Sequence, residues 1–190
     1  MNSTLSSPPR PPQQAWLTTY YFTRAAFSFA WLLAAVKVAP HSWAAAILLM
    51  AYPAWDALAN LVDGKRSGGF KANPSQALNG VVSLVVAAAV AFSLPNMHRV
   101  LAVFGVWAIL SGILQLATGA RRWKDHGAQW PMLLSGIQSA LAGGFFVFQS
   151  SGAVEPSVAG IAGYAGFGAF YFLLSALTLL FKARRRARSA

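Results

Sequence analysis

The amino-acid sequence predicts an all-α protein: an integral membrane bundle of six transmembrane helices, arranged as three helical hairpin repeats of parallel orientation. Three observations lead to this prediction. Of the 190 residues, 56% are hydrophobic and only 10% are charged, whereas about a quarter of an average soluble domain is charged. Six apolar segments approach the roughly 20 residues that a spanning helix needs. A proline, a second apolar segment and a basic cluster then recur three times along the chain.

The six apolar segments cover about residues 20–39, 42–62, 76–94, 100–118, 131–148 and 158–181. Pro40, Pro95 and Pro156 stand at the turns after the first, third and fifth segments. Because proline cannot continue a helix, each of them marks the tip of a hairpin. The hairpins therefore cover about residues 20–62, 76–118 and 131–181, inside one membrane domain of residues 16–182. If the repeat reflects duplication, the copies are related by an axis along the membrane normal.

The two ends of the chain lie outside this domain. Residues 1–15 are rich in Ser, Pro and Gln, and we expect them to form a disordered tail. Residues 183–190 form a basic tail. The basic clusters begin at Lys65, Arg121 and Lys182, each 25 or 26 residues after its proline, and all fall on one side of a six-span arrangement. The excess of Lys and Arg in cytoplasmic loops places both termini in the cytoplasm.

The formal net charge of +11 raises the question of nucleic acid as a partner. Basic clusters beside spanning helices set the topology and contact anionic lipid headgroups. We therefore expect the lipid bilayer, and not nucleic acid, to be the partner of these clusters.

Each even-numbered segment carries a polar stripe toward its cytoplasmic half. Polar residues spaced by four and then three positions share one face of a helix, and polar stripes in spans face the bundle interior. These positions are Asp56, Asn60 and Asp63 in the second segment, Ser111 and Gln115 in the fourth, and Ser175 in the sixth.

Small residues recur on the fourth and fifth segments. Glycine on one helix face lets two backbones approach closely, which is how helices associate in lipid. We expect these faces to pack within the chain, and the alternative is contact with a second copy or with other membrane proteins. The residues are Gly105, Gly112 and Gly119 on the fourth segment, and Gly136, Ala140 and Gly144 on the fifth.

Arg24 and Asp56 are the charged residues deepest in the predicted spans. The first two segments run in opposite directions, and both residues lie one to two turns from the cytoplasmic end. At 1.5 Å per residue, the arginine side chain can reach the carboxylate. Two readings remain open: an ion pair that fixes how two helices pack, or a proton or ion site, which a kink at Pro53 would help to hydrate. Asp63 stands beside Lys65, where we expect it to be solvated.

His41 and His98 follow two of the turn prolines on the predicted outer face. Histidine changes charge between roughly pH 5 and 8, so the pair has the chemistry of a sensor of external acid. The simpler expectation is two solvated loop residues without partners.

Motifs of catalysis are absent from the sequence. It contains no cysteine, no phosphate-binding loop, no His-Glu-x-x-His and no nucleophile elbow. No His, Asp or Glu residues have the spacing of metal ligands. We therefore expect no enzyme, no metal and no cofactor.

Two stretches carry a family resemblance. Residues 106–116 read Val-Trp-Ala-Ile-Leu-Ser-Gly-Ile-Leu-Gln-Leu and are followed by Arg121 and Arg122, and residues 130–148 contain Leu-Leu-Ser-Gly-Ile and Gly-Gly. Here the chain resembles the bacterial HdeD-type membrane proteins, which consist of short two-helix repeats of unknown function. The resemblance covers roughly residues 20–181 and is poorest in the first hairpin, where Pro53 and Asp56 have no counterpart in the second.

The resemblance implies a multi-pass protein of the bacterial cytoplasmic (inner) membrane with a link to resistance against acid stress. It carries over no catalytic residue. Two other functions compete with acid protection. One is a small transporter or channel that uses the polar stripe around Asp56, Gln115 and Ser175. The other is a scaffold that binds membrane proteins through its glycine faces.

Overall fold

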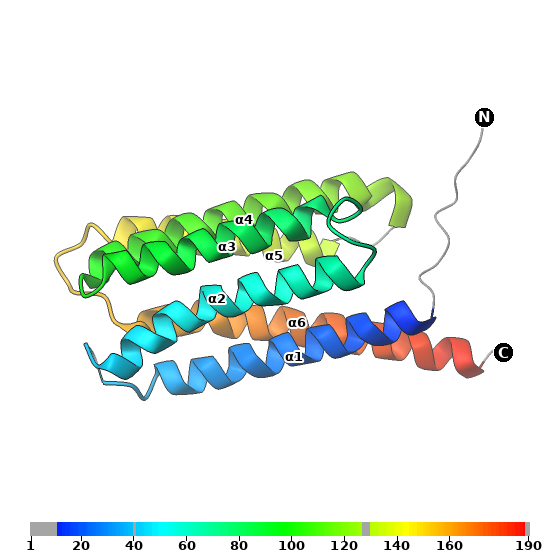
Figure 1. Cartoon of the computed structure of the whole chain (residues 1–190), viewed down its shortest axis with the longest axis horizontal. Coiled ribbons are helices and arrows are strands. Elements are labelled where there is room, and N and C mark those ends of the chain that lie inside the picture. Colours follow the sequence, from blue (N-terminus) through cyan, green and yellow to red (C-terminus); the bar gives the residue numbers. More distant parts are fainter. Residues whose placement is uncertain (1–10, 40, 127–129, 189–190) are drawn as a thin grey trace.

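A computed structural model of the chain describes residues 11–39, 41–126 and 130–188, and these residues form six helices and no strand (Figure 1). The helices are α1 (Pro11–Ala35), α2 (Trp43–Arg66), α3 (Pro74–Ser93), α4 (Met97–His126), α5 (Trp130–Gln149) and α6 (Val158–Arg188). Successive helices run in opposite directions, so the start of α1 and the end of α6 lie at the same end of the bundle. We call this the terminal end, and the opposite one the hairpin end.

Four helices are long and apolar enough to cross a membrane: Trp43–Arg66, Pro74–Ser93, Met97–Ala117 and Val158–Arg185. Within the described residues, the apolar part of α5, Leu133–Gln149, is shorter than these four. The mean hydropathy of α1 is too low for it to be counted with them. The reason in α1 is the polar stretch near its middle, where Thr18, Thr23 and Arg24 lower the mean hydropathy. The structure thus supports the predicted all-helical membrane protein, with four of the six predicted spans.

The recurring prolines mark helix starts at the hairpin end. Each of α2, α4 and α6 begins with a polar side chain that accepts a hydrogen bond from the backbone N–H three residues later. These pairs are Ser42 with Ala45 at 3.1 Å, Asn96 with Arg99 at 3.0 Å and Ser157 with Gly160 at 3.3 Å. Such a cap contributes about 1 kcal/mol. Proline followed by a capping residue therefore explains why the pattern repeats, although Pro40 itself lies outside the described residues.

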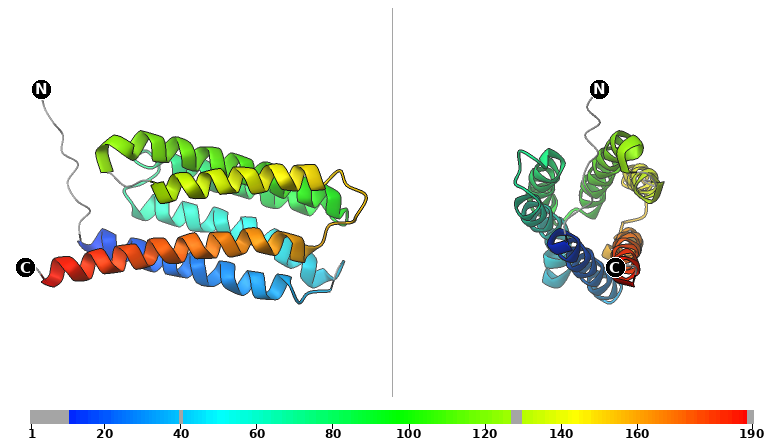
Figure 2. Two further views of the ribbon diagram at one scale, coloured as in Figure 1. Left: turned by 180° about the vertical axis from the view of Figure 1, so that it is seen from behind. Right: turned by 90° about the vertical axis from the view of Figure 1, so that its right-hand side faces the viewer.

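The six helices form a closed ring in chain order (Figure 2). The most extensive contacts join α4 to α5, α1 to α6 and α2 to α3, while the pairs inside the predicted hairpins, such as α1 with α2, touch less. The hairpins therefore are not the tightest packing units. Each helix packs best on its neighbour from the adjacent hairpin.

Glycines make the contact between α4 and α5 close. A Cβ atom on Gly112 would lie 2.5 Å from the carbonyl oxygen of Gly136 and 2.7 Å from the backbone nitrogen of Ala140. A Cβ atom on Gly105 would lie 2.8 Å from the carbonyl oxygen of Gly143. The prediction of packing within the chain is confirmed for these positions.

The predicted position of Gly144 on the packing face of α5 is wrong. Gly144 is exposed and a Cβ atom there would meet nothing within 4 Å, so its neighbour Gly143 takes the packing position. Gly119 lies outside the residues whose side chains the structure describes.

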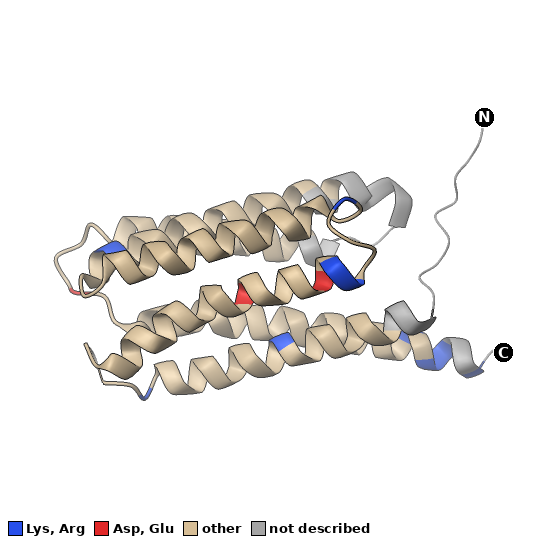
Figure 3. Cartoon of the chain, viewed as in Figure 1, with Lys and Arg blue, Asp and Glu red and all other residues tan. Residues whose placement is uncertain are grey.

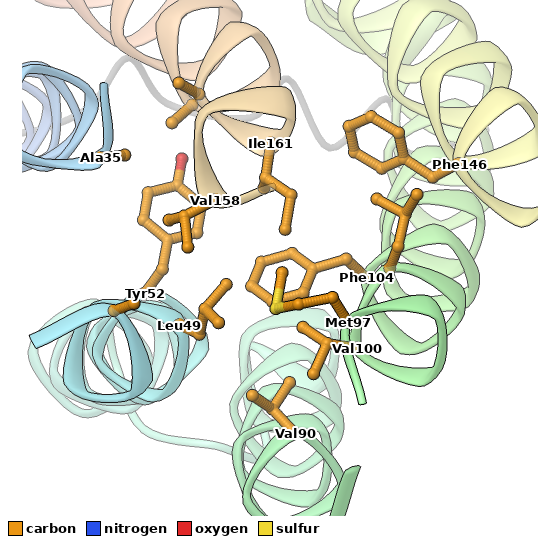
Figure 4. Close-up of a cluster of buried hydrophobic side chains, with 14 of the residues drawn as sticks. Ala35, Leu49, Tyr52, Val90, Met97, Val100, Phe104, Phe146, Val158 and Ile161 are labelled. Atoms are coloured by element: carbon orange, nitrogen blue, oxygen red, sulfur yellow. The ribbon is translucent and has the colours of Figure 1, made fainter. Parts of the chain in front are cut away.

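An apolar cluster fills the hairpin half of the ring. The labelled side chains in Figure 4 reach from all six helices toward the middle of the bundle. Leu49, Phe104 and Ile161 are each at most 1% exposed. We call this cluster the apolar plug, and its largest fully buried side chains are Leu49, Val90, Val100, Leu101, Phe104 and Ile161.

The outer surface of the ring is apolar as well. Phe92, Leu141 and Phe148 are 88%, 69% and 79% exposed. Charged residues gather mostly toward the two ends of the bundle, with few along its length (Figure 3). Large exposed apolar surfaces indicate contact with lipid or another protein.

The helices extend beyond the predicted boundaries. Residues 11–15, expected to be disordered, form the first turns of α1, and the expected basic tail continues α6 as far as Arg188. Residues 1–10 and 189–190 lie outside the described residues. The sequence hides the early start because Pro11 and Pro12 occupy the first turn of a helix, where proline is tolerated.

Candidate functional site: a polar cavity in the terminal half of the bundle

A cavity of about 290 Å³ lies inside the ring, on the terminal side of the apolar plug. All six helices contribute to its wall. It begins beside Tyr52 and Trp107, near the middle of α2 and α4, and reaches Asp63 and Ser75 at the terminal ends of α2 and α3. The inside of the bundle is therefore divided into an apolar half and a half in which polar and charged side chains lie among aromatic ones.

Asp56 is the centre of the hydrogen-bond network in this cavity. Its Oδ1 accepts from Nη2 of Arg24 in a short ion pair. Its Oδ2 accepts from the side-chain amide of Asn60 at 3.0 Å and from the hydroxyl of Ser83 at 2.7 Å. The indole of Trp107 donates to that same hydroxyl at 3.1 Å. One carboxylate thus connects α1, α2, α3 and, through Ser83, α4.

Arg24 has a partner on each side. Its Nη1 donates to the hydroxyl of Tyr20 at 2.8 Å, and its Cζ lies 4.1 Å from the ring centroid of Phe172 on α6. The side chains of Arg24 and Asp56 are only 12% and 16% exposed. Burying charges is costly unless they are paired and hydrogen-bonded. Here the two charges are paired and both Nη atoms of Arg24 are hydrogen-bonded, whereas its Nε has no partner among the described residues. The ion pair that the sequence suggests is present in the structure.

Pro53 stands one turn before Asp56 inside α2 and is buried. Proline leaves a carbonyl of the preceding turn without its helical hydrogen bond. In that turn, the indole of Trp31 on α1 donates to the carbonyl oxygen of Leu48 at 2.7 Å. The carbonyl that Pro53 frees is that of Leu49, so the donor from α1 reaches the adjacent carbonyl and not the freed one.

The three remaining stripe residues in α4 and α6 also line the cavity. They are Ser111, Gln115 and Ser175. The hydroxyl of Ser175 donates to the carbonyl of Tyr171 in its own helix at 2.8 Å. In contrast, Oε1 of Gln115 is buried and has no hydrogen-bond partner within the described structure. The cavity therefore holds an acceptor that a ligand can satisfy.

Asp63 differs from expectation. It is 5% exposed, not solvated, and its Oδ1 accepts from the indole of Trp16 at 3.1 Å and from the hydroxyl of Ser67 at 3.0 Å. Trp16 also lies under Arg66, whose Cζ is 4.4 Å from its ring centroid. The early start of α1 is the reason, because it brings Trp16 over the end of α2.

His41 and His98 lie at the hairpin end of the bundle, and neither of them lines the cavity. Nε2 of His41 is 3.5 Å from Oε1 of Glu155, and Nδ1 of His98 is 3.0 Å from the carbonyl oxygen of Ser150. Both histidines thus contact the loop between α5 and α6, so the expectation of loop residues without partners is wrong. A role in sensing acid stays a prediction.

Helices α3 and α5 contribute polar residues that the sequence analysis missed. Ser75, Asn79 and Ser83 recur every four residues on α3, and Ser135 and Ser139 do so on α5, and all but Ser83 line the cavity. The hydroxyl of Ser139 donates to the carbonyl of Ala108 at 2.9 Å and lies 3.0 Å from the hydroxyl of Tyr164. The same helical spacing that identified the even-numbered helices would have found these residues.

Among the described residues, no three His, Cys, Asp or Glu side chains come together as they would around a metal ion. The groups that do converge in the cavity are hydroxyls, amides, aromatic rings and one ion pair. This arrangement is suited to holding a small polar molecule.

The four apolar helices that are long enough to cross a membrane indicate the class: a multi-pass helical membrane protein. Residues 78–148, from within α3 to the end of α5, match a family described as "Short repeat of unknown function (DUF308)". Comparisons with curated proteins and with solved structures give no match.

Proposed function

We propose that this is a six-span protein that binds a small polar solute in the cavity and carries it across the membrane. The observation that supports this most is the division of the bundle, with a polar cavity that reaches one end and an apolar plug that fills the other. Carriers bind their substrates near the bilayer midplane and open to one side at a time. The cavity begins at Tyr52 and Trp107, near the middle of their helices.

The spans extend to α1 and α5 in this proposal. Both present large apolar side chains on the outside of the ring, with Phe29 and Leu33 on α1 and Leu141 and Phe145 on α5 between 45% and 69% exposed. Apolar surface of this kind is stable in contact with lipid.

Orientation follows from the basic residues. Lys65, Lys71 and Lys182 are exposed at the terminal end, which is also the end that the cavity reaches. By the positive-inside rule, both termini and the cavity face the cytoplasm, and the membrane is the bacterial cytoplasmic membrane. The proposal includes no catalytic step. The carboxylates of Asp56 and Asp63 accept hydrogen bonds from neighbouring side chains in it and have no role as acid or base.

The experiment uses the absence of cysteine from the chain. In membrane vesicles of known orientation, the variant Ser111→Cys should react with a small, membrane-impermeant methanethiosulfonate reagent applied from the cytoplasmic side. Because the apolar plug separates this position from the other side, the same reagent applied there should leave the cysteine unmodified.

The matched control is Leu110→Cys, next to Ser111 on α4. Leu110 is 42% exposed on the outside of the ring, so a cysteine there should face lipid and stay unmodified from both sides. An unreactive Ser111→Cys in a correctly inserted protein would exclude a hydrated cavity and with it the proposed function.

A second candidate function comes from the resemblance described for the sequence, since the family matched at residues 78–148 has no assigned function. The resemblance to HdeD-type proteins implies protection of the cell against acid, and a carrier in the cytoplasmic membrane is compatible with such a role. Survival of a strain that lacks the gene at low pH tests it. The scaffold alternative loses much of its proposed surface, because Gly105, Gly112 and Gly136 are buried between α4 and α5.

A further inference from the structure

The charge of the cavity limits which solute it can hold. Its described lining contains one cationic residue, Arg24, and two carboxylates, Asp56 and Asp63. Because Arg24 is paired with Asp56, the excess is one negative charge, located at Asp63. The hydrogen bonds that Asp63 receives from Trp16 and Ser67 leave this charge in place. An anionic solute would meet repulsion, and a cation would restore neutrality.

Aromatic rings make up much of the wall. They include Tyr21, Tyr52, Trp107, Tyr164, Tyr171 and Phe172, drawn from four helices. The face of an aromatic ring attracts a cation, most strongly where water is excluded. The cavity already contains one such contact, since the guanidinium carbon of Arg24 lies 4.1 Å from the ring centroid of Phe172. The wall is therefore built to accept positive charge.

Two side-chain groups of the lining are buried without a hydrogen bond among the described residues: the donor Nε of Arg24 and the acceptor Oε1 of Gln115. Of the two, the acceptor is the group to which a cationic ligand can donate. A buried polar atom left unpaired carries a free-energy penalty. A ligand that donates an N–H bond to this oxygen removes the penalty. This favours a protonated amine over a cation that has no N–H group.

We propose that the ligand of the cavity is a small protonated organic amine, an inference that rests on the proposed function. Its ammonium group donates to Oε1 of Gln115 and balances the excess negative charge, while its carbon skeleton packs on the aromatic wall. The volume of about 290 Å³ lies near the lower end of ligand pockets and fits a small molecule. The exposed Lys65 and Arg66 stand outside the lining, where lipid headgroups and salt screen their charges.

Three probes of one shape separate charge from size. They are tert-butylammonium, which is a cation with N–H donors, tert-butanol, which is neutral, and pivalate, which is an anion. Each is added to purified Ser111→Cys protein at equal ionic strength, and the rate of modification is measured. At a concentration ten times its dissociation constant, tert-butylammonium should slow the reaction by about tenfold, and the other two should have little effect.

The outcomes distinguish the two proposals. Protection by pivalate, or equal protection by tert-butanol, overturns the amine and leaves a binding cavity. A reactive cysteine that no probe protects also overturns the amine and leaves a hydrated cavity. Calorimetric titration of the unmodified protein with tert-butylammonium is a second measurement that does not depend on the cysteine, because absence of binding overturns the amine directly.

A pair of substitutions at one position tests the aromatic wall. Tyr171→Leu removes the ring and should weaken tert-butylammonium binding by about fivefold, whereas Tyr171→Phe keeps the ring and should bind normally. If Tyr171→Phe weakens binding as much as Tyr171→Leu, or if neither does, the ring takes no part in binding the cation.

Discussion

At the scale of the residue, Asp56 holds a structural position in the wall of the cavity. Its two oxygens accept hydrogen bonds from Arg24, Asn60 and Ser83. Asp56→Asn leaves the guanidinium of Arg24 buried without a counter-charge. We expect it to lower the free energy of unfolding by about 3–5 kcal/mol, the usual effect of breaking a buried pair. Thermal unfolding of the detergent-solubilised protein measures this loss.

The double variant Arg24→Gln with Asp56→Asn is the control. It removes both charges and keeps groups of similar size, so it should be more stable than Asp56→Asn alone. A double variant whose loss equals the sum of the two single losses would show that Arg24 and Asp56 do not stabilise each other.

The pairing of Arg24 with Asp56 could be predicted from helix direction and side-chain reach, because both depend only on positions along the chain. The environment of Asp63 could not. Its burial depends on Trp16, in a stretch whose prolines resemble a disordered tail. Ser83 was missed although its spacing from Ser75 and Asn79 could have revealed it. Trp107 was missed for another reason: an apolar ring shows no polar spacing, and which face of α4 turns inward is decided by packing across the ring.

At the scale of the element, the contact between α4 and α5 depends on backbones that touch. Gly112→Ala places a Cβ atom 2.5 Å from the carbonyl oxygen of Gly136, so the helices must move apart. We expect a loss of about 1–3 kcal/mol, which is typical of overpacking, measured by thermal unfolding in detergent. Gly144→Ala is the matched control on α5, because its Cβ atom meets nothing within 4 Å. Equal stability of the two variants would contradict close packing at Gly112.

Helix existence was predictable from apolar length, but helix pairing was not. Proline spacing identifies which helices are joined by a short turn, and this favours hairpins as the packing units. The structure instead places the closest contacts between hairpins, as at α4 with α5 and α1 with α6. A small residue such as Gly105 permits close approach without specifying the neighbour. Which helix packs against which is decided by how all six helices fit together in the ring.

At the scale of the whole molecule, the plug and the cavity give the two sides of the membrane different access to the interior. If the cavity serves acid protection, a strain that lacks the gene should survive a low-pH challenge less well than the same strain complemented with the intact gene. Tyr171→Phe should complement and Tyr171→Leu should not, because only the former keeps the ring on which the amine packs. Colony counts after the challenge, at matched membrane abundance of each variant, measure this. Equal survival with and without the gene would exclude acid protection, whereas rescue by both variants would show that protection does not depend on the aromatic wall.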